Sequence, residues 1–127
     1  MAAAEDECKV VPDFAQRTFA LALRVVRLCQ KLHEMPGVPR TIGYQLLRSG
    51  TSIGANYEES QAAQSRPDFA SKNCIALKEA RETHYWLRLL IAAEILPSPM
   101  LNDLLDEVEQ VSKILGAIVA KTRSNHD

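Results

Sequence analysis

The chain has 127 residues, of which 46% are hydrophobic and 24% charged, and its formal net charge is −1. This length suits one globular domain that buries a core without disulfides or metal. The near-neutral charge excludes a strong overall attraction to nucleic acid or anionic membranes. Basic residues nevertheless predominate between residues 13 and 97, and acidic ones at both ends.

The N-terminal segment and the cysteines favour a cytoplasmic protein. The first seven residues lack the basic region and apolar run of a signal peptide. Charges interrupt every apolar run before it reaches membrane-spanning length, so no membrane partner is expected. Cys8, Cys29 and Cys74 are odd in number and lack Cys-x-x-Cys spacing, which is typical of free thiols in a reducing compartment.

The first predicted helix covers residues 13–34. Residues 1–11 are small and acidic, which predicts a flexible tail, and Asp13 after Pro12 is the expected N-cap. Two prolines around Gly37 end the helix. Apolar positions recur at steps of four and three, which places them on one face: Phe14, Thr18, Leu21, Val25, Leu28 and Leu32.

The second predicted helix covers residues 40–63, with Leu46, Ile53 and Tyr57 on its apolar stripe. Its middle, residues 49–55, is rich in glycine, serine and threonine and therefore poor in helix propensity. We expect it to stay helical because both ends show helical period. Small side chains also admit a neighbouring helix closely, which offsets a cost of about 1 kcal/mol per glycine.

The third and fourth helices are predicted over residues 66–95 and 99–122, with a flexible tail at 124–127. Ser65 is the expected N-cap of the third helix, with Asp68 at the capping-box position and Pro67 in the first turn. The expected stripes are Phe69, Asn73, Ala76, Ala80, Thr83, Leu87, Leu90 and Ile91, and Leu101, Leu104, Leu105, Val108, Val111, Leu115, Ile118, Val119 and Thr122.

Four long helices with short connections predict an all-α fold, an antiparallel up-down-up-down four-helix bundle over residues 12–123. Two helices carry a second apolar flank, which a monomeric bundle does not need. Burying it contributes several kcal/mol at about 25 cal/mol per Å2. We therefore expect a homo-oligomer with an interface at Phe19, Leu23, Val26, Ile75, Trp86 and Leu89. Packing of this flank under the chain's own loops and tails is the alternative.

The sequence offers no recognisable catalytic chemistry. His33, His84 and His126 lack the glutamate three residues earlier that di-iron bundles use, and the scattered cysteines and histidines form no chelating pair. Phosphate-binding loops and nucleophile elbows are absent as well. We expect no cofactor, no metal and no enzymatic activity.

A polar constellation lies on the second and third predicted helices. Two interpretations stay open: a hydrogen-bonded network that fixes helix register, or a contact for a ligand or RNA. Lys78 is expected to pair with an acid of the second helix such as Glu58 or Glu59. The members are Ser49, Ser52, Asn56, Glu59, Lys78, Glu79 and Glu82.

Basic residues form stripes on the first and third predicted helices. Spacings of seven place them on one edge of each helix, and an aromatic ring accompanies the second stripe. Arginines beside an aromatic ring suit phosphate contact with base stacking, although solvated helix faces look alike. The candidate nucleic-acid contacts are Arg17, Arg24, Arg27, Lys31, Arg81, Tyr85 and Arg88.

Two sequence blocks resemble a known bacterial family. Residues 48–59 read RSGTSIGANYEE: a basic residue, a run of small residues, Ser-Ile-x-x-Asn and then acids. The second block contains Asp-Phe at 68–69, IALKEA at 75–80, Glu-Thr at 82–83 and YWL at 85–87. This pattern is similar to that of the bacterial four helix bundle protein family, also called the 23S rRNA intervening-sequence proteins.

The resemblance implies a left-handed four-helix bundle that assembles as a homopentameric ring and has no catalytic residues. Some members are encoded within segments inserted in ribosomal RNA genes. A related branch, the accessory proteins of diversity-generating retroelements, forms a basic pentameric barrel that binds nucleic acid and a reverse transcriptase. This chain departs from that branch because it lacks a strong positive charge.

The functional hypothesis is a non-enzymatic oligomeric helical scaffold that binds structured RNA or DNA. The alternative is a protein–protein adaptor that binds no nucleic acid and whose basic stripes are only solvated faces.

Overall fold

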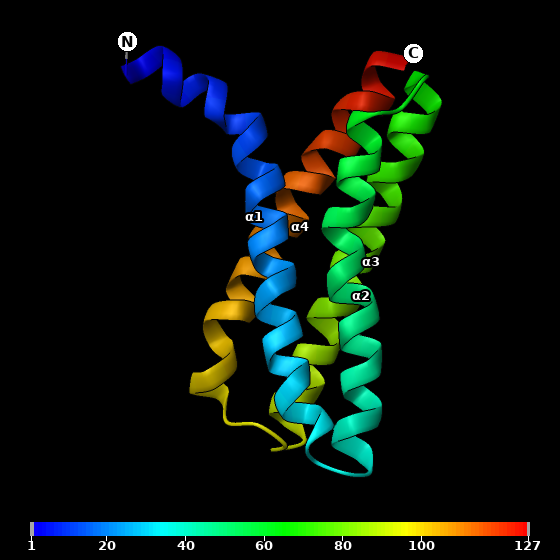
Figure 1. Ribbon diagram of the computed structural model, residues 1–127. Coiled ribbons are helices and arrows are strands. Elements are labelled where there is room, and N and C mark those ends of the chain that lie inside the picture. The colour runs from blue at the N-terminus through cyan, green and yellow to red at the C-terminus, as the bar shows by residue number, and fades with distance from the viewer. Residues whose placement is uncertain (1, 127) are drawn as a thin grey trace.

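The computed structural model describes the backbone of residues 2–126 and the side chains of residues 13–124. Four long helices make up the molecule (Figure 1): α1 Ala2–His33, α2 Val38–Gln61, α3 Arg66–Ala92 and α4 Ser98–His126. No strand occurs between residues 2 and 126. The predicted all-α class with four helices is therefore confirmed. Over the same stretch, no helix is both long and apolar enough to cross a membrane.

The bounds of the helices differ from the expected ones at several ends. Residues 2–11, expected to lie outside the first helix, belong to α1, so Asp13 lies inside this helix and not at its N-cap. Alanines favour helix, and acids near a helix N-terminus interact favourably with its dipole, which accounts for the extension. Pro12 then sits in the helix interior, where it removes a backbone hydrogen bond. Figure 1 shows the first turns of α1 bent away from the other helices.

Helix α2 is continuous through its small residues, and the reason is close packing against α1. Gly50 and Gly54 are buried. A Cβ atom built on Gly50 would lie 2.6 Å from Val25 Cγ1, and one on Gly54 would lie 3.0 Å from Thr18 Oγ1. Only glycine leaves room for α1 at position 50, and a side chain at position 54 would press against Thr18. The unfavourable propensity of the run is therefore offset by helix–helix contact.

Capping residues explain where α3 begins and ends. Ser65 is the N-cap, as predicted, and its hydroxyl accepts a hydrogen bond from the Asp68 backbone N–H at 3.1 Å. At the other end Glu94 adopts a left-handed conformation with φ of 58°. This turn lets the Ile95 N–H reach the Leu90 carbonyl at 3.0 Å, so α3 stops at Ala92, three residues before the expected end.

The core forms where the predicted stripes meet. Helices that follow each other in the chain pack side by side, whereas α4 meets α1 only marginally, and α1 and α3 do not adjoin within the described residues. Phe69 and Ile91 of the predicted α3 stripe, and Leu105, Ile118 and Thr122 of the α4 stripe, are only half-buried. The fully buried apolar residues include Phe14, Leu21, Val25, Leu32, Leu46, Ile53, Tyr57, Leu87, Leu90, Leu101, Val108, Val111 and Leu115.

Candidate functional site

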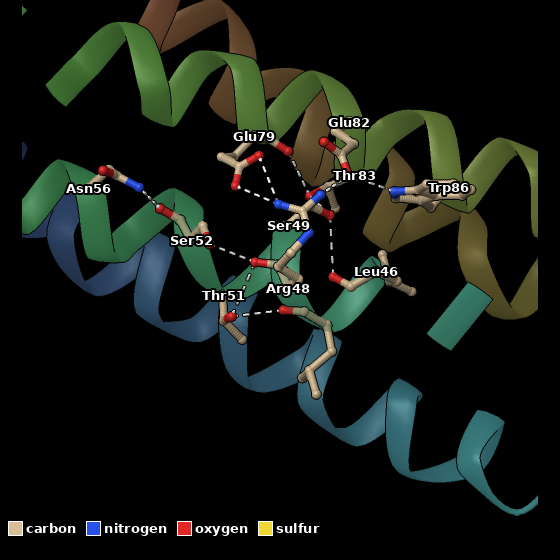
Figure 2. Close-up of polar contacts among 11 residues, drawn as sticks. Leu46, Arg48, Ser49, Thr51, Ser52, Asn56, Glu79, Glu82, Thr83 and Trp86 are labelled. Atoms are coloured by element: carbon tan, nitrogen blue, oxygen red, sulfur yellow. Dashed lines mark hydrogen bonds and ion pairs between the residues drawn. The ribbon is translucent and has the colours of Figure 1, made fainter. Parts of the chain in front are cut away.

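A clasp between α2 and α3 dominates the polar constellation (Figure 2). The Arg48 guanidinium of α2 reaches across to two carboxylates of α3: it donates to Glu79 Oε2 at 3.1 Å and to Glu82 Oε2. Glu79 and Glu82 lie one helical turn apart, so one planar guanidinium can bind both. We call Arg48, Glu79, Glu82 and Trp86 the arginine clasp.

Trp86 completes the arginine clasp from within α3. Its indole Nε1–H donates to Glu82 Oε2 at 3.0 Å (Figure 2). This hydrogen bond, followed by the bonds and charge of Arg48, lowers the pKa of Glu82 despite its partial burial. The hydrogen bond to Glu82 in turn raises the pKa of Arg48. Glu82 therefore stays ionised and holds two donors in place.

Beneath the clasp, a pair of buried hydroxyls joins the same two helices. Thr83 Oγ1 lies 2.9 Å from Ser49 Oγ and 2.8 Å from the Glu79 carbonyl oxygen, and it donates its single proton to one of them. The Ser49 hydroxyl donates to the Leu46 carbonyl at 3.3 Å. Ser49 and Thr83 are both completely buried. This contact joins α2 to α3 in the buried interior, where sliding of one helix along the other would break it.

Other members of the predicted network do not join it. Ser52 donates to the Arg48 carbonyl and Asn56 to the Ser52 carbonyl, so both side chains bond the backbone of their own helix (Figure 2). The ion pair expected for Lys78 is also different, because Lys72 Nζ lies 3.1 Å from Glu59 Oε1. Lys78, six residues further along α3, forms no ion pair with Glu58, Glu59 or any other described carboxylate.

The cations of the basic stripe on α1 fall into two groups. Arg17 binds Glu107 of α4 through two nitrogens, at 2.8 and 2.9 Å, and also donates to Gln110. This hydrogen bonding raises the pKa of Arg17 and occupies its guanidinium. Arg24, Arg27 and Lys31 are exposed, and no carboxylate among the described side chains pairs with them. Three of the four predicted contacts are thus accessible to a polyanion.

The basic stripe of α3 is exposed as well. The Arg88 guanidinium lies 5.9 Å from the centre of the Tyr85 ring, a cation–π distance. Tyr85 packs edge-on against Trp86 with ring centres 5.1 Å apart. Arg81 lies one turn before Tyr85 and is also exposed. Since α1 and α3 do not adjoin, the two basic stripes belong to separate faces of one chain.

The second apolar flank is partly open to solvent in the single chain. Phe19 is 65% exposed, Leu23 41% and Ile75 40%. Val26, Trp86 and Leu89 are half-buried, and the last two pack against the core of their own chain. The single chain thus covers part of Trp86 and Leu89 with its core, not with its loops, and leaves Phe19 largely exposed.

The cysteines and possible metal ligands are scattered over the part of the chain that the structure describes. Within the described residues no group of three or more histidine, cysteine or acidic side chains lies close enough to hold a metal. Cys29 and Cys74 are free thiols, and the side chain of Cys8 lies outside the described residues. Burial raises the pKa of Cys29 to about 11, which keeps this thiol protonated and unreactive.

The region with these features matches one family model. The model of the 23S rRNA-intervening sequence protein covers residues 13–117. The chain belongs to this family. The match includes the whole arginine clasp and the glycines at the α1–α2 contact, and it begins where α1 joins the bundle. The resemblance seen in the two sequence blocks is therefore confirmed.

A solved structure agrees with membership of the 23S rRNA-intervening sequence protein family. It is the 1.70 Å crystal structure of a protein with unknown function from the S23 ribosomal protein family of Bacteroides thetaiotaomicron VPI-5482. The two chains are 40% identical with a TM-score of 0.77, and the similarity covers 84% of this chain and 97% of the other. No curated protein matches the chain.

Proposed function

We propose that this protein is a non-enzymatic scaffold that assembles with copies of itself and binds structured RNA through its exposed cations. The proposed assembly is a cytoplasmic homopentameric ring of antiparallel up-down-up-down bundles. The observation that supports this proposal most is an exposed stripe of three cations, Arg24, Arg27 and Lys31. None of them pairs with a carboxylate among the described side chains, although acidic residues slightly outnumber basic ones in the chain.

Self-association is supported by the exposed part of the apolar flank. Phe19 and Leu23 project from α1 and Ile75 from α3, which are not adjoining helices. Two patches on different faces of one chain suit a head-to-tail contact that closes into a ring. Such a contact also brings the basic stripe on α1 of one copy toward the basic stripe on α3 of the next. Two short basic surfaces would then join into a longer one.

RNA binding is supported by the types of side chain on these stripes. Arginine binds phosphate through a planar fork of donors, and counterion release makes such binding favourable at low salt. Tyr85 is 49% exposed beside Arg88, so an unpaired base could stack on its ring. Helical RNA would instead be held by its phosphates alone.

A protein–protein adaptor is the second candidate, and two observations favour it. The net charge of −1 provides no long-range attraction to RNA. Arg17, one of the predicted contacts, is already neutralised by Glu107. In this case the exposed apolar side chains would be the functional surface, and the stripes would serve solubility.

A fluorescence anisotropy titration against a structured RNA, repeated across salt concentrations, tests RNA binding. The test variant is Arg24→Ala/Arg27→Ala. The control is Arg40→Ala/Lys113→Ala, which removes the same charge from exposed positions outside the stripes. We expect the test variant to bind more weakly and to reduce the slope of log affinity against log salt by about one per cation. Equal binding by both variants, or no binding at low salt, refutes the proposal and favours the adaptor.

A further inference from the structure

A pocket between the middle of α3 and the end of α4 gathers three cations. Its volume is about 280 Å3, and it is lined by Cys74, Leu77, Lys78, Arg81, Val119 and Arg123. Lys78 and Arg81 lie one turn apart on α3, and Arg123 approaches from α4. We call these three residues and their pocket the cationic pocket.

The side chains that line the cationic pocket include three cations and no carboxylate. None of Lys78, Arg81 and Arg123 forms an ion pair with a described carboxylate. Lys78 helps to lower the pKa of Glu82 by its charge, but that carboxylate is already bound by Arg48 and Trp86. Three like charges around one small space repel each other, so fold stability alone does not favour the arrangement.

One of these cations also contacts the pocket lining. Arg123 is exposed, and its Nη2 donates to Cys74 Sγ at 3.5 Å, which directs the guanidinium toward the pocket. Leu77 and the buried Val119 provide an apolar floor between the cations. The pocket thus offers cationic donors at its rim and an apolar surface between them.

We propose that the cationic pocket binds a phosphate monoester. A dianionic phosphate is the group that three converging cations neutralise best, and arginine forks match its oxygens. The volume accommodates the phosphate and its adjoining organic group on the apolar floor. The site goes beyond the proposed RNA contact, because neither Lys78 nor Arg123 belongs to the basic stripes. The phosphate can come from a free nucleotide or from the 5′ end of an RNA.

Phosphorus NMR titration of AMP with the full chain tests the site, with adenosine and sulfate as comparison ligands in competition. Arg123→Gln and Arg81→Gln should each weaken AMP binding roughly tenfold, since each removes a charged hydrogen bond. Lys113→Gln, an exposed cation elsewhere on α4, should leave it unchanged. Circular dichroism confirms that each variant is folded.

Alkylation of Cys74, followed by peptide mass spectrometry, locates the ligand. AMP should slow the alkylation of Cys74 several-fold, whereas adenosine should not. A 5′-phosphorylated oligonucleotide that binds more tightly than AMP assigns the site to RNA ends, and equal affinity assigns it to small phosphate esters. Sulfate binding as tightly as AMP, or equal alkylation with AMP and adenosine, overturns the proposal.

The outcome is separable from that of the proposed function. Arg24→Ala/Arg27→Ala leaves the cationic pocket intact, so AMP should bind to this variant as to the unmodified chain. Loss of AMP binding in that variant would contradict an independent pocket.

Discussion

The arginine clasp shows how a few polar side chains align two helices. Arg48 is half-exposed, so its ion pairs alone contribute little to stability. Their effect is positional, because the clasp lies directly above the buried Ser49–Thr83 contact and both link the same turns of α2 and α3. A shift of one helix along the other would break both contacts at once.

Acid should weaken the clasp through Glu82. Its pKa is lowered in the folded protein, so its stabilising contribution is complete at neutral pH and is lost as the pH falls through the folded-state value. Urea unfolding between pH 7 and pH 3 should therefore show a smaller loss of stability for Glu82→Gln than for the unmodified chain. Trp86 is the single tryptophan, so its fluorescence reports the change directly. Identical pH profiles for the two proteins would show that Glu82 contributes nothing.

Arg17 should matter for stability and not for RNA. It makes a bidentate bond to Glu107 at the otherwise sparse α1–α4 contact. Arg17→Met keeps the aliphatic stem and should lower the free energy of unfolding by up to about 1 kcal/mol. Urea denaturation measures the loss. RNA affinity should change less than in Arg24→Ala, an exposed cation of the same helix; the reverse order would show that the ion pair opens to bind RNA.

Side-chain partners were the least predictable feature at this scale. Spacing correctly placed Glu79 and Glu82 on one face of a helix. It did not identify Arg48 as their partner, although this residue opens the first block of the family pattern. Which cation reaches which acid depends on the register of two helices and on the distance between them. The spacing of residues along a single helix determines neither quantity. The same limit applies to Arg17 and Glu107, 90 residues apart.

At the level of helices, the closest contact is made by glycine. The side chain of Val25 occupies the space that a Cβ atom on Gly50 would need. A matched control exists on α4, where a Cβ atom on Gly116 would meet no atom within 4 Å. The two positions separate the packing role of glycine from its poor helix propensity.

Gly50→Ala and Gly116→Ala should therefore act in opposite directions. We expect Gly50→Ala to lower the free energy of unfolding by about 1–3 kcal/mol, because α1 must move away from α2. Gly116→Ala should raise it by up to about 1 kcal/mol through helix propensity. Thermal and urea unfolding followed by circular dichroism measure both. Stabilisation by both substitutions would mean that α1 and α2 are not in close contact.

Helical period predicted the elements far better than their ends. Every member of the predicted apolar stripe of α1 is buried, and the small-residue run of α2 is helical as expected. The N-terminal extension of α1 was missed because Pro12 was interpreted as a boundary, whereas the structure accommodates it inside the helix. The early stop of α3 depends on a left-handed Glu94, a conformation that its residue type does not favour.

For the whole molecule, the exposed apolar side chains of the flank are unfavourable in a single chain because they remain in contact with water. Phe19→Ser/Ile75→Ser should lower the free energy of unfolding of the single chain only modestly, since Phe19 is 65% exposed and Ile75 40% exposed in it. The proposed self-association should weaken at least tenfold. Val38 is 64% exposed at the start of α2, away from the flank, so Val38→Ser is the matched control. Sedimentation velocity across a dilution series measures the difference, and equal sedimentation of all variants would place the interface elsewhere.

The mass of the unmodified protein in solution tests the proposed scaffold most directly. One chain is 14.1 kDa. Multi-angle light scattering at micromolar concentration should give a stable particle of five times this mass, with Phe19 and Ile75 protected from solvent. A single 14.1 kDa particle at the same concentration would contradict self-association and leave the two basic stripes on separate faces of a monomer.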